Sequence, residues 1–207
     1  MSRKFLSFLV LFFTILGLFS TVVESLSRER VYLESQCQSA MYHDLCVQTL
    51  LPYMNKNVVP SPQRLAQISL ASCLSKARVT KTYVNMLAKK LNQTGNSQDY
   101  QALEECVHQI DNGVDQITRS FKELQQMGTD GDENFVWHES NVMSWVSAAL
   151  TDVTTCIDGI TGDGIGRREK AMIKARFLNM KQLASNSLMM FTRFTTRYRA
   201  SRGIKNP

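Results

Sequence analysis

The chain has 207 residues, with 24 basic and 18 acidic side chains and a formal net charge of +6. This length is sufficient for one domain with a substantial hydrophobic core. The charge is modest, and the basic residues form no stripe interleaved with aromatic residues, so the sequence does not indicate a nucleic-acid-binding protein.

The first 25 residues have the pattern of a secretory signal peptide. Two basic residues precede an apolar run over residues 5–20, and a small-residue cleavage site follows at 23–25. The run also has the length of an uncleaved membrane anchor, which is the alternative. Polar interruptions within the run favour cleavage, and no second hydrophobic segment of that length exists. We therefore predict a secreted protein without membrane association after residues 1–25 are removed.

Residues 27–54 are predicted to form two short helices. Five cysteines in a secreted chain imply disulfide bonds and one unpaired thiol. Cys37 and Cys46 lie nine residues apart in this segment. A bridge between them closes a helical hairpin that is too small to be stable alone, and it contributes roughly 2–3 kcal/mol through loop entropy.

The next predicted helix begins at Ser61-Pro62, because serine is a favourable N-cap and proline suits the first helical turn. The helix runs to about Leu91, and Lys81 is a misfit in its apolar seam. A glycosylation sequon begins at Asn92, where this helix ends and an acceptor is accessible. We therefore predict a glycan on Asn92.

Two helices with regular apolar seams follow. The first begins at Ser97, and its seam runs from Leu103 to Leu124 in steps of four and three residues. A segment with two glycines, residues 128–132, ends it. The second seam covers residues 142–160 with the same spacing.

The last predicted helix begins near Arg167 and carries an apolar seam between Ile173 and Phe194. Its end, residues 193–205, is basic. Cations near a helix C-terminus complement the helix dipole, which is the simpler explanation. Adhesion to an acidic wall polysaccharide is the alternative.

The fold class follows from these elements. Four long helices joined by short links predict an all-α, up-down-up-down four-helix bundle, here with an N-terminal helical hairpin closed by a disulfide bond. No segment alternates apolar and polar residues over a strand length, so we expect no sheet.

A second disulfide bond is predicted from helix geometry. Cys106 lies 21 residues before Met127, and Cys156 lies 21 residues after Phe135. In an antiparallel helix pair rising ~1.5 Å per residue, the two cysteines stand at one level and can be bridged with little strain. The bond closes a loop of about fifty residues and contributes roughly 4 kcal/mol. Cys73 remains, either as a buried thiol or as a site for an intermolecular bond.

The sequence contains no convincing catalytic or metal site. Glu105 and His108 have the spacing of a di-iron motif, but no second copy exists. Residues 130–141 imitate a calcium loop, yet Phe135 stands where glycine is required. No Gly-x-Ser-x-Gly or Cys-x-x-Cys motif is present. We therefore predict that the chain is not an enzyme and holds neither a metal nor a cofactor.

Two polar stripes flank the predicted Cys106–Cys156 bond. The first consists of His108, Asp111, Asn112 and Asp115, and the second of Thr151, Thr155 and Asp158. A solvated helix face is the simplest explanation of such a stripe. A surface presented to another protein is the alternative.

Several segments of the mature chain together carry a recognisable pattern. They are Cys37 to Cys46 with Tyr42 between them, residues 102–106 (ALEEC) leading to Val114-Asp115, residues 145–151 (WVSAALT), residues 155–159 (TCIDG) and residues 183–188 (LASNSL). Over residues 28–200 the chain resembles the plant invertase/pectin methylesterase inhibitor family. The resemblance implies a four-helix bundle with an N-terminal hairpin and the disulfide bonds Cys37–Cys46 and Cys106–Cys156, and it leaves Cys73 outside that set.

The resemblance also implies a function. Members of the family are secreted protein inhibitors that cover the active-site cleft of a cell-wall enzyme in a non-covalent complex. Invertase inhibitors of the family carry a Pro-Lys-Phe turn between the second and third bundle helices, whereas residues 128–139 contain no proline. The chain stops at Pro207, so we expect a separate inhibitor, not the pro-region of an enzyme. We therefore expect a pectin methylesterase as partner in the apoplast, with an invertase as the alternative.

The same resemblance suggests which residues face the enzyme. Thr155 and Asp158 fall on family positions that face it, and Asp115 and Thr151 are added from the polar stripes. Acidic and hydroxyl side chains on a rigid helix pair would fill a cleft that accepts an anionic chain, which requires no cofactor. Two other functions stay open: a secreted helical-bundle ligand without an enzyme target, and a structural wall protein held to pectin by its basic tail.

Overall fold

The computed structural model describes residues 28–55, 58–93, 97–127, 134–160 and 165–204. Within these ranges the chain is helical almost throughout and forms no β-strand, which confirms the predicted all-α class. The predicted signal peptide, residues 1–25, lies outside the described residues.

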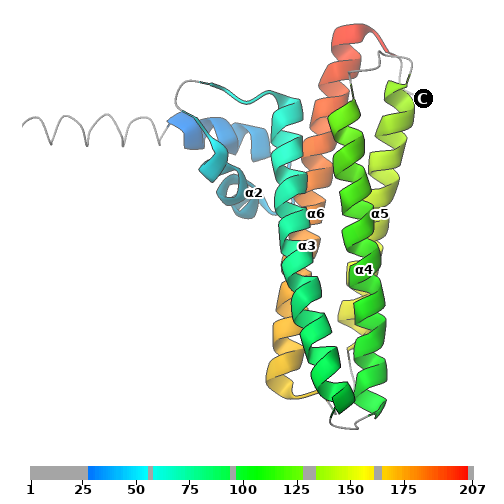
Figure 1. The fold of residues 1–207 in the computed structure, drawn as a ribbon. Coiled ribbons are helices and arrows are strands. Elements are labelled where there is room, and N and C mark those ends of the chain that lie inside the picture. Colours follow the sequence, from blue (N-terminus) through cyan, green and yellow to red (C-terminus); the bar gives the residue numbers. More distant parts are fainter. Residues whose placement is uncertain (1–27, 56–57, 94–96, 128–133, 161–164, 205–207) are drawn as a thin grey trace, which may run out of the picture.

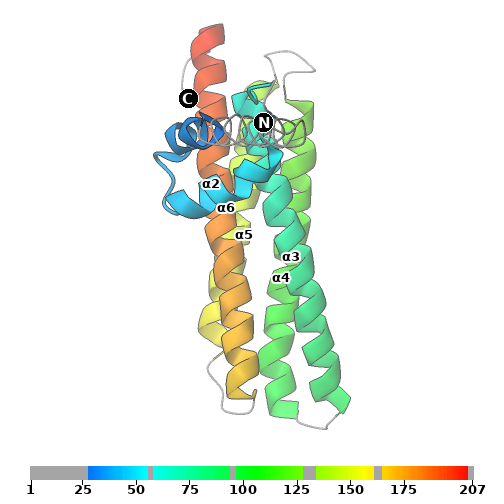
Figure 2. The same ribbon diagram turned by 90° about the vertical axis from the view of Figure 1, so that its left-hand side faces the viewer.

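Four long helices lie side by side, and successive helices run in opposite directions (Figures 1 and 2). They are α3 (Pro62–Gln93), α4 (Ser97–Gln126), α5 (Phe135–Gly159) and α6 (Arg167–Arg202). Both α3 and α5 pack against α4 and α6, so the four helices enclose one core. The helices begin close to the predicted residues; at α3 the Ser61 hydroxyl accepts a hydrogen bond from the backbone N–H of Arg64 at 3.1 Å, as an N-cap does.

The apolar seams form the core, with one correction. Every predicted seam residue of α5 and α6 is buried. On α4, however, Val107, Val114 and Phe121 are only partly buried. Cys106, Gly113 and Ser120 take their places in the core. Every second residue of the predicted α4 seam was wrong, because α4 is rotated so that its small residues meet the core. The packing there is close: a Cβ atom at Gly113 would lie only 3.1 Å from Cε of Met180.

Lys81, the misfit in the α3 seam, does not enter the core. Thr80 is buried beside it and donates its hydroxyl hydrogen to the Lys76 carbonyl oxygen at 2.9 Å. Lys81 instead extends to α4, where its Nζ atom lies 3.0 Å from Oδ1 of Asp111. The misfit is therefore a half-exposed ion pair between two neighbouring helices.

The N-terminal hairpin is fixed to the outside of the bundle. It comprises helical residues 28–37, α2 (His43–Leu50) and the short η1 (Leu51–Tyr53), and the Cys37–Cys46 disulfide bond closes it. Asn186 of α6 donates to the Tyr42 carbonyl oxygen at 2.9 Å and accepts from the Tyr42 N–H at 3.3 Å. This buried amide explains why asparagine occupies the segment 183–188: it satisfies both backbone groups of the hairpin turn.

Cys73 is an unpaired thiol in the core, 0% exposed. Burial raises its pKa to about 12. We expect the native protein not to react with a thiol reagent at pH 8, and the unfolded protein to react with one equivalent, as measured by mass spectrometry without reduction. Because the folded-state pKa exceeds that of an unfolded thiol, Cys73 should also lower the free energy of unfolding as pH rises from about 9 towards 12. Rapid labelling of native protein, or a dimer linked through Cys73, would contradict this.

Candidate functional site

The predicted partner-binding residues lie on α4 and α5, which a disulfide bond joins directly. Cys106 and Cys156 are both buried, and their Cα atoms are 4.8 Å apart. Cys106 lies in the first half of α4 and Cys156 near the end of α5, as the antiparallel arrangement requires. The bond therefore prevents α4 and α5 from sliding or rotating relative to each other near the polar stripes.

All four of these side chains are exposed. On α5, Thr151 and Thr155 donate their hydroxyl hydrogens to the carbonyl oxygens of Ser147 and Thr151, at 3.3 and 3.0 Å. The hydroxyl oxygens keep acceptor capacity for a partner. On α4, Asp115 accepts a hydrogen bond from Arg119 at 2.6 Å, an exposed pair one helical turn apart that constrains the carboxylate only weakly.

The structure brings three of the residues together and sets the fourth apart. Thr151, Thr155 and Asp158 follow one another on the outer side of α5, opposite its buried seam. Asp115 lies on the neighbouring helix, nine residues from Cys106, which is about 13 Å along the axis from the disulfide bond. The four residues are thus two contact points on one face, separated by roughly two helical turns.

The α4 stripe is narrower than the sequence suggests. Asp111 turns to α3 and forms the ion pair with Lys81, so it does not belong to the face that α4 shares with α5. His108 and Asn112 stay on that face, where their side-chain nitrogens lie 3.3 Å apart. Spacing alone places all these residues on one stripe, whereas the position of α3 decides which of them forms an ion pair with that helix.

Asp152 is an acidic residue of this face that sequence reasoning missed. It is half-buried between α5 and α4. Burial raises the pKa of its carboxyl group, and a hydrogen bond from Gln116 and the nearby His108 counteract part of this shift. No sequence signal separates it from exposed acidic residues such as Asp158, because its burial depends on how closely α4 approaches.

Trp137 is a second residue that sequence reasoning missed. It lies in the first turn of α5 and is 68% exposed, although an indole side chain is normally well buried. It precedes Thr151 by 14 and Asp158 by 21 residues, so it lies on the same side of the helix. This spacing was available in the sequence. We call the exposed row formed by Trp137, Ser144, Thr151, Thr155 and Asp158 the α5 outer row.

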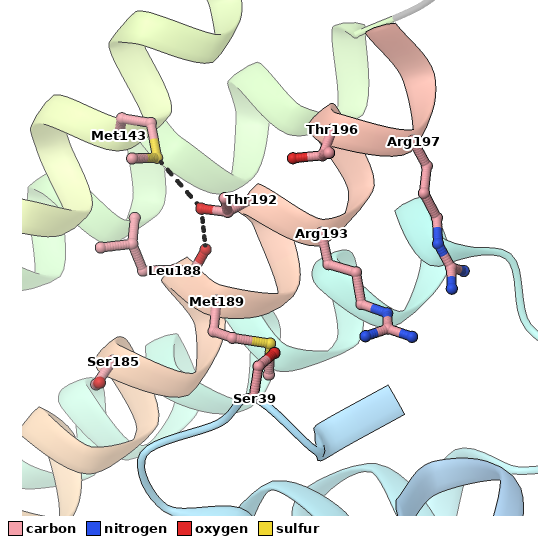
Figure 3. A pocket seen from close by; sticks show the side chains of 9 residues that line it. All are labelled: Ser39, Met143, Ser185, Leu188, Met189, Thr192, Arg193, Thr196 and Arg197. Atoms are coloured by element: carbon pink, nitrogen blue, oxygen red, sulfur yellow. Dashed lines mark hydrogen bonds between the residues drawn. The ribbon is translucent and has the colours of Figure 1, made fainter. Parts of the chain in front are cut away.

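The α5 outer row is about 30 Å long at 1.5 Å per residue. Between its two ends only small or short polar side chains are exposed, so another protein can approach the helix closely along its length. Elsewhere, cavities open between α5 and α6, of which one of about 610 Å³ is drawn in Figure 3. None of the four predicted residues lines it.

The described part of the chain holds no group of three side chains able to bind a metal ion together. The first residues of the calcium-like segment, Asp130 and Asp132, lie outside the described residues. Among the same residues, no helix combines the length and the apolar character required to cross a membrane.

The sequence matches a known protein family. The sequence profile of the plant invertase/pectin methylesterase inhibitor family matches residues 31–190. The chain belongs to this family. The match extends from the hairpin to the middle of α6 and includes both disulfide bonds. Members of this inhibitor family are not enzymes, and accordingly neither is this chain.

Individual relatives agree with the family assignment. Pectinesterase inhibitor 9 of Arabidopsis thaliana is 34% identical over 189 residues, which cover 91% of this chain and 90% of that protein. Pectinesterase inhibitor 11 of the same plant is 33% identical over 168 residues, covering 81% and 82%. The crystal structure of a pectin methylesterase inhibitor from Arabidopsis thaliana matches with a TM-score of 0.53 and 17% identity, over 79% of this chain and 96% of that chain. At this identity the match shows a common fold.

Proposed function

We propose that the chain is a secreted inhibitor of a pectin methylesterase of the plant cell wall. The observation that carries the proposal is its 34% identity with Pectinesterase inhibitor 9 over nine tenths of both chains. In the proposed mechanism, the face formed by α4 and α5 covers the active-site cleft of the enzyme. No covalent step and no cofactor takes part.

The charge of the α4–α5 face supports this mechanism. The α4 sequence contains six acidic and two basic residues, and α5 contains three acidic residues and no lysine or arginine. Asp111 and Glu139 are paired with cations of α3 and α6, whereas Asp115 and Asp158 are exposed. An enzyme cleft that accepts an anionic polysaccharide attracts negative charge. Carboxylates such as Asp115 and Asp158, with the hydroxyls of Thr151 and Thr155, therefore complement such a cleft.

The rigidity of the face supports it as well. The Cys106–Cys156 bond and the packing of α4 against α5 fix the backbone positions of these residues before binding. Little conformational entropy is then lost when the complex forms, and more of the contact energy contributes to affinity.

The proposal is tested by titrating the purified protein, starting at residue 26, against a plant pectin methylesterase and a plant invertase. We expect loss of methanol release at a stoichiometric concentration of the protein, and unchanged sucrose hydrolysis. Inhibition of invertase alone would show that the target is an invertase and not a pectin methylesterase. Inhibition of neither would contradict an inhibitory role and favour a helical-bundle ligand.

Trp137 should contribute to this contact. An exposed tryptophan at the end of the α5 outer row offers a large apolar area, and tryptophan is enriched among residues that dominate binding energy. We expect Trp137→Ala to raise the inhibition constant roughly fivefold, which corresponds to about 1 kcal/mol, without lowering the melting temperature. Tyr53→Ala, which removes an exposed aromatic ring from η1, is the control and should have no effect. If both variants have the same inhibition constant, Trp137 does not contact the enzyme.

Secretion and glycosylation form part of the proposal. Asn92 lies in the last turn of α3 and is exposed, so a glycan on it can extend into solvent. Expressed in plant cells, the protein is expected in the cell-wall fluid, starting near residue 26. Glycosidase treatment should shift its electrophoretic mobility, and Asn92→Gln should abolish the shift. Retention of residues 1–25 on a membrane-bound form would contradict cleavage.

A further inference from the structure

The two sides of the bundle carry opposite charge. Whereas α4 and α5 are acidic, α3 contains six basic residues and no acidic residue, and α6 contains ten basic residues and one acidic residue. Because α3 packs against α6, the two basic helices lie next to each other on one side of the bundle, although Lys81 and Arg199 turn to carboxylates of α4 and α5. The basic side is turned away from the face proposed to bind the enzyme.

Three arginines of α6 already have a carboxylate or aromatic partner. Arg199 donates from Nε to Glu139 at 2.8 Å and also contacts it through Nη2. The Arg176 guanidinium group lies 4.3 Å from the ring centre of Tyr83. Arg202 lies over the ring of Tyr198 at 5.6 Å. Arg199 and Arg176 thereby join α6 to α5 and to α3, whereas Arg202 contacts a residue of its own helix.

Arg193 and Arg197 differ from them. They lie one helical turn apart, project from the same side of α6 and line the cavity of about 610 Å³ (Figure 3). Arg193 is oriented by a hydrogen bond from its Nε to Oε1 of Gln36 at 3.1 Å. Neither arginine has a carboxylate partner among the described residues. Glu34, two residues before Gln36, is bonded to Arg30. Burial lowers the pKa of Arg193, the nearby charge of Arg197 adds to this shift, and Tyr32 counteracts part of it.

The remaining lining of the cavity is suited to a sugar chain. Hydroxyl groups of Ser39, Ser185, Thr192 and Thr196 alternate with the apolar side chains of Met143, Leu188 and Met189. The cavity is an open groove between α5 and α6 that Ser39 of the hairpin borders, so an extended polymer can enter and leave it. A second groove of about 380 Å³ continues it and shares Met143, Thr192 and Thr196.

We propose that Arg193 and Arg197 bind carboxylate groups of a linear polyuronate, such as de-esterified pectin, in this groove. Guanidinium groups pair well with carboxylates, and the hydroxyl lining can exchange hydrogen bonds with sugar hydroxyls. The biological consequence of this binding rests on the proposed function, because de-esterified pectin is the product of a pectin methylesterase. The basic side would then hold the inhibitor where the enzyme has acted, while the acidic face stays available, and local concentration would strengthen inhibition there.

The test is retention of the purified protein on immobilised polygalacturonate, compared with highly methyl-esterified pectin and polyglutamate, over increasing salt concentration. We expect binding to polygalacturonate alone. Arg193→Gln/Arg197→Gln should weaken it about tenfold, the loss of one charged hydrogen bond or more. The control Lys89→Gln/Lys90→Gln removes the same charge from exposed positions at the far end of α3 and should bind as the unchanged protein does.

Three outcomes would overturn the inference. Equal loss in both double variants would mean attraction by net charge alone. Equal retention on methyl-esterified pectin would exclude carboxylate recognition, and retention on polyglutamate alone would indicate an acidic protein as the ligand. Melting temperature and inhibition of pectin methylesterase on a soluble substrate check that the variants are folded. If the protein binds polygalacturonate but inhibits no pectin methylesterase, the proposed function fails and this inference stands.

Discussion

Reversing the charge of both acidic residues on the α4–α5 face, as Asp115→Lys/Asp158→Lys, is expected to weaken inhibition of pectin methylesterase at least tenfold. Tenfold corresponds to about 1.4 kcal/mol. Each lysine would place a cation against a cleft that accepts an anionic chain, and like charges at an interface oppose binding. Both side chains are exposed, so the melting temperature should stay unchanged. The measurement is the inhibition constant at low and at high ionic strength, since screening should reduce the difference.

The matched control is Glu34→Lys/Asp44→Lys. It changes the net charge by the same amount, but both residues lie on the N-terminal hairpin. If its inhibition constant rises as much as that of Asp115→Lys/Asp158→Lys, the effect comes from net charge. An unchanged inhibition constant for Asp115→Lys/Asp158→Lys itself would show that these residues are not in the contact.

Removal of the Cys106–Cys156 bond should cause the largest loss of stability. The bond closes a loop of 50 residues. In the loop-entropy account, Cys106→Ala/Cys156→Ala therefore lowers the free energy of unfolding by about 4 kcal/mol. For a domain of this size, the melting temperature should fall by roughly 8–16 °C. Inhibition should weaken as well, even below the melting temperature, because α4 and α5 are no longer held at one level.

The hairpin bond provides the comparison. Cys37→Ala/Cys46→Ala opens a loop of nine residues and should cost roughly 2–3 kcal/mol. It leaves the α4–α5 pair intact, so its inhibition constant should match that of the unchanged protein. Chemical denaturation and inhibition assays on both double variants separate stability from activity. If the Cys106→Ala/Cys156→Ala variant inhibits fully while folded, a covalently rigid face is not required.

Several features of the fold could be read from the sequence because they depend on neighbours along the chain. The alternation of four and three residues predicts each long helix, and Ser61 before Pro62 predicts the start of α3. Cys106 and Cys156 could be paired by counting residues from the intervening turn, because helix rise is constant. Exposure of the α5 outer row follows from its position opposite the seam.

Other features depend on how each helix is rotated against its neighbours. Asp111 and Asp115 are one turn apart on α4, yet only Asp111 is taken by Lys81 of α3. The predicted α4 seam was wrong at Val107 for the same reason, since Cys106 and Gly113 turn to the core instead. Because a helix has 3.6 residues per turn, an apolar pattern alone does not distinguish between two rotations of the helix that differ by one residue. The packing of all four helices decides between them.

The charges of the helices illustrate the difference between what depends on the local sequence and what depends on the packing of helices. The sequence by itself determined that residues 62–93 and 167–202 are basic helices and that residues 97–126 and 135–159 are acidic ones. Only the tertiary structure decided that helices of like charge lie next to each other, and that Arg193 and Arg197 face an open groove instead of a carboxylate. The physical reason is that helix formation depends on local spacing, whereas the partner of a side chain depends on which distant helix packs beside it.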